Sequence, residues 1–473
     1  MKPKNLAAYF FSLVVLVFVT TVLFLWPDRM GLFFGLITAI SILFVSFLKP
    51  FIGLLLLLGF IPFQSFFNFF LPPIGTVWMG AAIRDGLAAA VVLGWLFRKL
   101  RRKEAFSALS WAEKWAIIYM CVVAFYIPAA PVLEGGLVGF RNMVGYVVLF
   151  VISADVVDTQ RRLLSVATIV VLSGFVLGLI GIAEVLTERD IFAIVGYDMV
   201  SLMGPDLPFI YLGTVRATGG TGNPLEFGLY MAIAGMICAA FLAARVPLIR
   251  RKFLIMPLIV MLAALLFTYA RSAYVALFAG ILGLVALSRK RRLLAPLLVS
   301  LVLLILISYT PYWELLGPRF KLEDTPGIAT MNARVEVWKT VLKTGFSEWM
   351  GSGLGTHGGA VGRAGLDPYF NITDNYYGSI LMQVGFIPLF LFLFFLGILT
   401  KTFFRLTRSQ KDPSLKAYAA SALTIVLMIA VNAFFSSAFE SRTLSILVWI
   451  LLGSSLRLED NCHYFQSDKP HDY

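Results

Sequence analysis

The 473-residue sequence is poor in charge. Aspartate, glutamate, lysine and arginine make up 14% of it, against about a quarter in an ordinary soluble domain. Hydrophobic residues account for 59%. Apolar runs of roughly 18 residues or more recur along the whole chain, which is the pattern of membrane-spanning helices. The composition therefore excludes an ordinary soluble domain and predicts an all-α polytopic membrane protein.

Cysteine and histidine are also scarce, with three of each in the chain. Cys121, Cys238 and Cys462 are too far apart to suggest a disulfide framework or a metal-binding spacing. Two of the histidines, His463 and His471, lie in the short polar C-terminal segment, so a metal site built from histidine is not expected. No small-residue cleavage site follows the first apolar run, which is therefore expected to remain as a helix.

The apolar runs also predict a topology. With the N-terminus inside, the basic segments between the runs all fall on the cytoplasmic side, as the positive-inside rule requires. The net charge of +13 is then a consequence of topology and does not indicate nucleic-acid binding. Both termini are expected in the cytoplasm. The expected spans are residues 7–26, 31–48, 51–69, 79–97, 113–130, 138–156, 162–186, 224–243, 253–269, 272–288, 293–310, 376–400, 417–435 and 441–456, and the short ones near 50–80 could instead be re-entrant.

Two polar segments interrupt this pattern, and both fall on the predicted outer side. The longer one has helical apolar spacing from Val335 to Leu342, which predicts an amphipathic helix, and then a glycine-rich turn. Long loops between helices usually carry function, so the site is expected to face outward. The expected division is N-terminal membrane helices 1–186, an extracytoplasmic loop 187–223, membrane helices 224–310, a large extracytoplasmic loop 311–375, C-terminal membrane helices 376–456 and a cytoplasmic tail 457–473.

Arginines stand at or near the outer ends of several spans, where the positive-inside rule makes them uncommon. An unpaired charge at such a depth is costly, so these residues are candidates for function. A guanidinium group suits phosphate oxygens because it can donate two hydrogen bonds at once. Together these arginines predict an anionic ligand at the outer leaflet. Each alone could instead be snorkelling to the membrane interface or forming an ion pair, as Asp85 beside Arg84 and Glu440 near Arg442 suggest. The set is Arg84, Arg141, Arg216, Arg271, Arg334 and Arg442.

The stretch "GLGTHG" (353–358) matches the dinucleotide fingerprint G-x-G-x-x-G. No strand is predicted before it and no βαβ unit after it, so dinucleotide binding is not expected. A tight turn is the simpler interpretation, and such a turn could still place His357 and backbone N–H groups over the site.

Four stretches resemble segments of one known family, and they occur in the order found there. "RATGGTGNPLEFGLYMAI" (216–233) resembles a helix start, and "TYARSAYVALFAGILGLV" (268–285) resembles a segment in which an arginine opens a long apolar helix. "ARVEVWKTVLKTGFSEWMGSGLGTHG" (333–358) is similar to part of a large periplasmic loop. "TDNYYGSILMQVGFIPLFLFLFFLG" (373–397) is similar to the segment that follows this loop, with a helix opened by an asparagine. The family that these stretches resemble is the O-antigen ligase and Wzy-type polysaccharide polymerase superfamily.

The resemblance implies a polymerase-like glycosyltransferase with a GT-C-like bundle of about 12–14 transmembrane helices. Such enzymes take a glycan from undecaprenyl pyrophosphate on the outer face of the plasma (inner) membrane, and they use no nucleotide sugar, no metal and no other cofactor. The implied partners are this lipid-linked oligosaccharide donor, a glycan or lipid-linked glycan acceptor and the lipid bilayer, with a chain-length regulator and a flippase as candidates. No nucleic acid is implied.

Residue by residue, the resemblance assigns Arg216 and Arg271 to the pyrophosphate, with Arg334 in support. Ligases of the family carry a histidine just before the asparagine of the last motif, whereas this chain has Asp374 before Asn375, a pattern closer to the polymerases. Asp374 is therefore a candidate general base or acceptor contact, or simply the N-cap of the helix. His357 is the other candidate base.

Other polar residues near these motifs complete the expected site. Tyr376 and Tyr377 could stack on sugars or anchor the helix at the interface. Glu226 could orient Arg216 or favour a helix N-terminus. Arg84, Arg141 and Asn375 are expected as further substrate contacts.

Two other functions stay open at the level of sequence. One is ligation of the glycan to lipid A-core or to protein. The other, a transporter or lipid-linked-sugar flippase, is less favoured because the two halves show no internal repeat.

Overall fold

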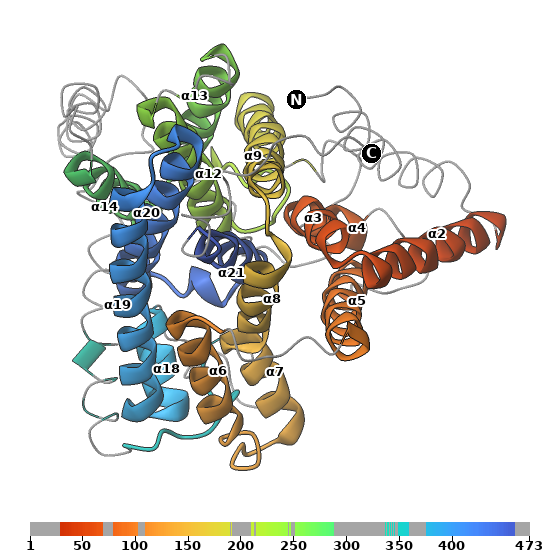
Figure 1. Cartoon of the computed structure of the whole chain (residues 1–473), viewed down its shortest axis with the longest axis vertical. Helices are drawn as coiled ribbons and strands as arrows, with labels where there is room; N and C mark the ends of the chain where they lie inside the picture. The colour runs from red at the N-terminus through yellow and green to blue at the C-terminus, as the bar shows by residue number, and fades with distance from the viewer. Residues whose placement is uncertain are drawn as a thin grey trace. The chain divides into compact units, whose positions relative to one another are not determined.

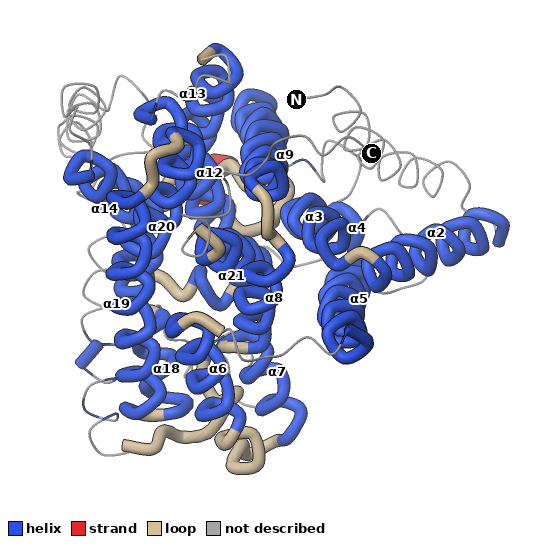
Figure 2. The backbone as a smooth tube through the Cα atoms, viewed as in Figure 1, coloured by secondary structure: helices blue, strands red, loops and turns tan. Residues whose placement is uncertain are grey.

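The structure is a computed structural model, and its described part is helical apart from one short β pairing (Figures 1 and 2). Strand β1 (Ile210–Tyr211) pairs antiparallel with β2 (Thr214–Val215). The structure describes residues 29–69, 79–102, 109–189, 191, 210–211, 214–244, 246, 251–287, 336, 338–339, 341, 343, 345, 349–358 and 375–458. The expected spans 7–26 and 293–310, as well as Arg334 and Asp374, lie outside these described residues.

Helices of membrane-spanning length confirm an all-α polytopic membrane protein. Within the described residues, six helices are long and apolar enough to cross a bilayer, and shorter apolar helices accompany them. The six are Gly80–Arg101, Leu133–Val156, Gln160–Thr187, Pro224–Ala244, Phe386–Ser409 and Pro413–Phe435.

The chain divides into two compact units. Unit 1 is Met1–Ser107 with Phe192–Asp198, and unit 2 is Ala108–Ile191 with Met199–Tyr473. In unit 1, α5 packs against α2 and α3, and glycine allows the closest approach: a Cβ at Gly94 would lie 2.0 Å from the carbonyl oxygen of Phe47. The described elements of unit 1 are α2 (Arg29–Leu48), α3 (Pro50–Phe60), η1 (Ile61–Phe63), α4 (Gln64–Phe69) and α5 (Met79–Arg102).

Unit 2 is built around α12, which packs against α9, α13, α14 and α20. Every residue of α12 from Phe227 to Phe241 is buried, as expected of a helix that is apolar all round. Helices α19 and α20 run alongside each other (Figure 1). The described helices of unit 2 are α6 (Trp111–Ala124), α7 (Leu133–Met143), η3 (Gly145–Val147), α8 (Val148–Val156), α9 (Gln160–Thr187), α12 (Pro224–Ala244), α13 (Lys252–Leu266), α14 (Arg271–Leu287), α18 (Tyr376–Val384), α19 (Phe386–Ser409), α20 (Pro413–Phe435), η8 (Ala438–Glu440) and α21 (Arg442–Leu456).

Helix α6 is shorter than the span 113–130 expected from its apolar run. Its start is fixed by a capping box, in which the Ser110 side chain accepts a hydrogen bond from the Glu113 N–H and the Glu113 side chain accepts one from the Ser110 N–H. It ends at Ala124, ahead of Pro128 and Pro131, and residues 125–132 form turns and bends. The prolines are the physical reason, because they cannot continue the helical hydrogen bonding.

The expected span 376–400 is divided into two helices at Gly385. This glycine has φ 79° and ψ −167°, a conformation that residues with a Cβ rarely adopt. The chain breaks there because the carbonyl oxygen of Trp349 approaches the backbone, accepting a hydrogen bond from the Phe386 N–H at 3.1 Å. A Cβ on Gly385 would lie 2.1 Å from that oxygen.

The break predicts opposite effects for two glycine substitutions. Gly385→Ala should lower the free energy of unfolding by at least about 2 kcal/mol, because it adds backbone strain and a clash. Gly397→Ala is the matched control, since Gly397 lies inside α19 with open space around it and alanine favours a helix by about 0.5–1 kcal/mol. Thermal unfolding of the detergent-solubilised protein would compare them. Equal midpoints for the two variants would contradict the strained break.

Candidate functional site

Arg216 is fixed against the loop that leads to Arg271. Its Nε donates a hydrogen bond to the carbonyl oxygen of Thr268 at 2.8 Å, and the N–H of Ala217 donates to the carbonyl oxygen of Phe267 at 3.0 Å. Arg216 is half-buried, while Arg271 is exposed as the first residue of α14. The structure thus brings the two arginine-bearing segments together. Residues 216–223 and 267–271 are called the arginine junction below.

Thr268 shapes the second segment of this junction. Its hydroxyl donates to the carbonyl oxygen of Leu265 at 2.6 Å and accepts from the N–H of Ala270 at 3.1 Å. Between them, Tyr269 takes the left-handed conformation with φ 52°. The chain therefore leaves α13 and enters α14 through a turn whose carbonyl at Thr268 is turned toward Arg216.

A buried carboxylate that the sequence analysis missed holds the first segment. Glu184, in the last turn of α9, is fully buried. It accepts hydrogen bonds from the N–H of Thr218 (2.7 Å), the hydroxyl of Thr218 (2.9 Å), the N–H of Gly219 (2.9 Å) and the N–H of Gly220 (3.3 Å). The signal was present, because a carboxylate inside an apolar run is a functional candidate by default.

The glycines of "RATGGTGN" are required by the turn around Glu184. Gly219, Gly220 and Gly222 have φ values of 56°, 80° and 77°, in the region where glycine has no steric penalty. A Cβ on Gly219 would also lie 2.3 Å from the Phe227 ring. This local conformation turns three successive N–H groups and the Thr218 hydroxyl toward one carboxylate.

The arginine junction ends in the start of α12. The side chain of Asn223 accepts a hydrogen bond from the N–H of Leu225 at 2.9 Å, which is N-cap geometry. Glu226 follows in the first turn of α12, where the helix dipole favours a negative charge. Favouring a helix N-terminus is one of the two roles expected for Glu226. The other role, orienting Arg216, stays a prediction.

A second cluster is formed by the glycine turn, defined as residues 349–358. Four of its glycines have positive φ, so "GLGTHG" is part of a tight turn as expected. The turn is bonded to the end of α18: the N–H groups of Ser352 and Gly353 donate to the carbonyl oxygens of Met382 (2.8 Å) and Gln383 (3.0 Å). The N–H of Gly355 donates to Oε1 of Gln383 at 2.8 Å.

His357 is oriented within this turn by two hydroxyl groups. Its Nδ1 lies 3.0 Å from Oγ1 of Thr356 and 3.4 Å from Oγ of Ser352. The single hydroxyl proton of Thr356 can go to Gly353 O at 2.7 Å or to Ser352 Oγ at 2.8 Å. When the Thr356 proton goes to either of these oxygens, Nδ1 of the neutral ring is the donor to Thr356; in the other tautomer Nδ1 accepts from a hydroxyl. Burial lowers the pKa of His357 below its ordinary value, which favours this neutral form.

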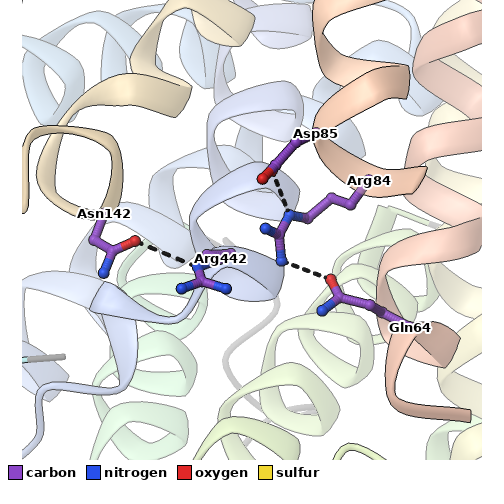
Figure 3. A network of polar contacts seen from close by, with 5 residues as sticks. All are labelled: Gln64, Arg84, Asp85, Asn142 and Arg442. Carbon is purple, nitrogen blue, oxygen red and sulfur yellow. Dashed lines mark hydrogen bonds and ion pairs between the residues drawn. The ribbon is translucent and has the colours of Figure 1, made fainter. Parts of the chain in front are cut away.

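The carboxylate of Glu440 lies against the residue that follows His357. A Cβ on Gly358 would be 2.3 Å from Oε2 of Glu440, so glycine is needed at this position. Two residues further on, Nε of Arg442 donates to Oδ1 of Asn142 at 3.3 Å (Figure 3). Asn142 follows Arg141 on α7. The turn that carries His357 therefore lies beside Glu440. Two residues after Glu440, Arg442 contacts α7 through Asn142.

The stretch at the start of α18 is buried. Asn375, and not Asp374, is the N-cap: its side-chain oxygen accepts from the N–H of Gly378. The Nδ2 of Asn375 is buried and has no hydrogen-bond partner among the residues that the structure describes. The capping alternative for Asp374 is thus wrong.

Tyr376 and Tyr377 are buried in aromatic packing. The Tyr376 ring lies against Phe392 and Phe439, and the Tyr377 ring against Phe434. Their hydroxyls donate to main-chain carbonyl oxygens, Tyr376 at 3.1 Å and Tyr377 at 2.7 Å. This packing gives both tyrosines a structural role, and the stacking on sugars expected from the sequence would require both rings to leave it.

Arg84 belongs to unit 1 and is paired there. Its Nε lies 2.8 Å from Oδ1 of Asp85, and its Nη1 donates to Oε1 of Gln64 at 2.8 Å (Figure 3). The side chain is 1% exposed. The ion-paired alternative for Arg84 is therefore confirmed, and a substrate contact by Arg84 stays a prediction.

Comparison with known proteins bears on this arrangement. The sequence model of the family described as "O-Antigen ligase" (Wzy_C) matches residues 256–393, which contain Arg271, the glycine turn and α18. A curated protein of Salmonella muenchen named "O-antigen polymerase" is 23% identical over 385 residues, 79% of this chain and 95% of the relative. Both comparisons support the resemblance to the O-antigen ligase and polymerase superfamily that the sequence motifs indicate. Arg216 and Glu184 lie outside the matched family segment, whereas Arg271 and His357 lie inside it.

The lowered pKa of His357 predicts a pH dependence of stability. Between its folded pKa and its ordinary pKa of 6.5, the unfolded chain binds a proton that the folded protein does not, so stability falls as the pH drops through this window. His357→Gln should remove that component, and His463→Gln should retain it. Thermal midpoints at several pH values between about 7.5 and 5 would measure the difference. The same slope in the wild type and in His357→Gln would contradict the burial of a neutral His357.

Proposed function

We propose that this protein is a membrane glycosyltransferase that polymerises undecaprenyl-pyrophosphate-linked oligosaccharide repeat units into a surface polysaccharide. The product would be an O-antigen, an exopolysaccharide, a capsule or a teichuronic-acid-like polymer. The observation that carries the proposal is the arginine junction, in which Arg216 is fixed against the loop preceding Arg271. The relative named "O-antigen polymerase", aligned over 79% of this chain, supports polymerisation as the reaction.

In this reaction the oxygen of an acceptor hydroxyl bonds to the anomeric carbon of the donor sugar. The bond between that carbon and the pyrophosphate oxygen breaks, and its electron pair leaves with undecaprenyl pyrophosphate. Negative charge therefore develops on the leaving group, where positioned guanidinium groups stabilise it without a metal ion. Arg216 and Arg271 are assigned this task, with Arg334 in support and Arg141 as a further substrate contact.

The proton of the acceptor hydroxyl needs a base, and two residues are candidates. Asp374 precedes the N-cap Asn375 and is the first candidate. His357 is the second, since two hydroxyl groups contact its Nδ1 and its burial lowers its pKa and so favours the neutral ring. Asn375 would contribute its buried Nδ2 to an oxygen of the acceptor or donor.

Ligation is the alternative reaction, with the glycan passed from undecaprenyl pyrophosphate to lipid A-core or protein. The match to the family described as "O-Antigen ligase" favours it. Against it, this chain has Asp374 where the ligases of the superfamily carry a histidine. We therefore place polymerisation first.

The reaction requires a particular location. We propose that the protein lies in the plasma (inner) membrane with both termini in the cytoplasm and with the arginine junction on the extracytoplasmic face. That face is where the lipid-linked donor, the growing glycan and a chain-length regulator would meet it.

Removing the protein from its host should separate polymerase from ligase. For a polymerase, the expected result is single-repeat material in place of a long ladder, because repeat units are no longer joined. Gels of surface glycans together with analysis of the lipid-linked pool would show it. A ladder of normal length that accumulates on undecaprenyl pyrophosphate would instead identify a ligase.

Substitution of the arginines tests the donor site. Arg216→Ala and Arg271→Ala should each lower the rate of transfer by at least about 10²-fold, because each removes a cation from the developing charge. Arg251→Ala is the matched control, since Arg251 is an exposed arginine at the start of α13. Purified protein and a synthetic lipid-linked repeat unit would provide the assay. Full activity in both junction variants would overturn the pyrophosphate assignment.

A further inference from the structure

We propose that Glu184 is the positioning residue that sets Arg216 for the donor pyrophosphate. This inference rests on the proposed function, in which Arg216 holds the leaving group. Glu184 would act through the backbone of the arginine junction, without touching the substrate.

The hydrogen bonds of Glu184 are concentrated on the segment next to Arg216. Four donors from three consecutive residues, Thr218, Gly219 and Gly220, face the two carboxylate oxygens at 2.7–3.3 Å. All are N–H or O–H groups, which matches a carboxylate that only accepts. A buried carboxylate is costly unless its oxygens are satisfied in this way. The segment is therefore held in one conformation around one side chain.

This conformation is transmitted directly to Arg216. Only Ala217 separates Arg216 from Thr218, and its N–H is bonded to the carbonyl oxygen of Phe267 at 3.0 Å. Because peptides are planar and successive Cα atoms lie about 3.8 Å apart, a displacement of Thr218 that the φ and ψ angles of Ala217 do not absorb moves the Cα of Arg216 or breaks that bond. The backbone that follows Arg216 is thus held by Glu184 and Phe267, and its side chain by Thr268.

The packing of α9 against α12 does not depend on these hydrogen bonds. The two helices are already in close contact where a Cβ on Gly174 would meet Ala234 at 2.9 Å and a Cβ on Gly181 would meet the Phe227 ring at 2.8 Å. The carboxylate of Glu184 holds the path of the junction, whose residues Gly219 and Gly220 take left-handed conformations, and it accepts one further hydrogen bond from the N–H of Ile191 at 3.4 Å. This distinguishes a residue that positions Arg216 from one that only joins two helices.

The first test replaces the carboxylate by its amide. Glu184→Gln presents an NH₂ group to N–H donors, so the junction should shift and kcat/KM for the lipid-linked donor should fall by about 10- to 100-fold, as for a misplaced catalytic group. Glu188→Gln is the matched control, because Glu188 is an exposed carboxylate four residues later on the same helix end. It should leave transfer unchanged. Full activity of Glu184→Gln would overturn the proposal.

A double-mutant cycle separates positioning from a general structural role. In an Arg216→Lys background, which retains a cation, Glu184→Gln should cause a much smaller loss than in the wild type, because the residue it positions is already changed. If Glu184→Gln lowers kcat/KM by the same factor in both backgrounds, the positioning role is overturned and the proposed function still stands. Wild-type activity in Arg216→Lys and Arg216→Ala would overturn the proposed function itself, and this inference with it.

A second variant covers failure of Glu184→Gln to fold. Thr218→Val removes the hydroxyl that donates to Oε1 of Glu184 and accepts from the N–H of Gly220, and it keeps the carboxylate. It should lower kcat/KM several-fold with an unchanged thermal midpoint, and its effect should also shrink in the Arg216→Lys background. An effect of the same size in both backgrounds would overturn the proposal.

Discussion

The arginine junction depends on the carboxylate of Glu184. Backbone N–H groups within a membrane protein must find partners inside the protein, because lipid offers none. The turn after Arg216 directs two glycine N–H groups and the Thr218 N–H and hydroxyl inward, and Glu184 satisfies all of them. Without it, the turn would hold unpaired polar groups among apolar helices. One acidic side chain thus allows an irregular, glycine-rich segment to exist next to Arg216.

Glycine serves the two clusters in the same physical way. In the arginine junction, Gly219 allows the chain to pass the Phe227 ring, and in the glycine turn, Gly358 allows it to pass the carboxylate of Glu440. Both residues also have positive φ. A Cβ at either position would displace the neighbouring group and add backbone strain, so glycine at these two positions follows from local packing and conformation.

The sequence predicts what depends on local apolar length and misses what depends on distant partners. The run 162–186 predicts α9, observed as Gln160–Thr187, because apolar length decides a membrane helix. The break at Gly385 was not predictable in this way, since its cause is the carbonyl of Trp349, 36 residues earlier. Glu184 was hidden inside an expected span, and its donors in the arginine junction are 34–36 residues away. Arg216, by contrast, was found because its motif is contiguous.

The two candidate bases are tied to one helix. Asn375 caps α18, so the carboxylate of Asp374 is not required for that cap. The turn that carries His357 is bonded through Ser352, Gly353 and Gly355 to the other end of the same helix, at Met382 and Gln383. Helix α18 therefore fixes the spacing between the segment that follows Asp374 and the histidine turn. The imidazole of His357 therefore stands in a turn bonded to the C-terminal end of α18, while the side chain of Asn375 caps its N-terminal end, so one short helix sets the distance between this imidazole and the Asn375 amide.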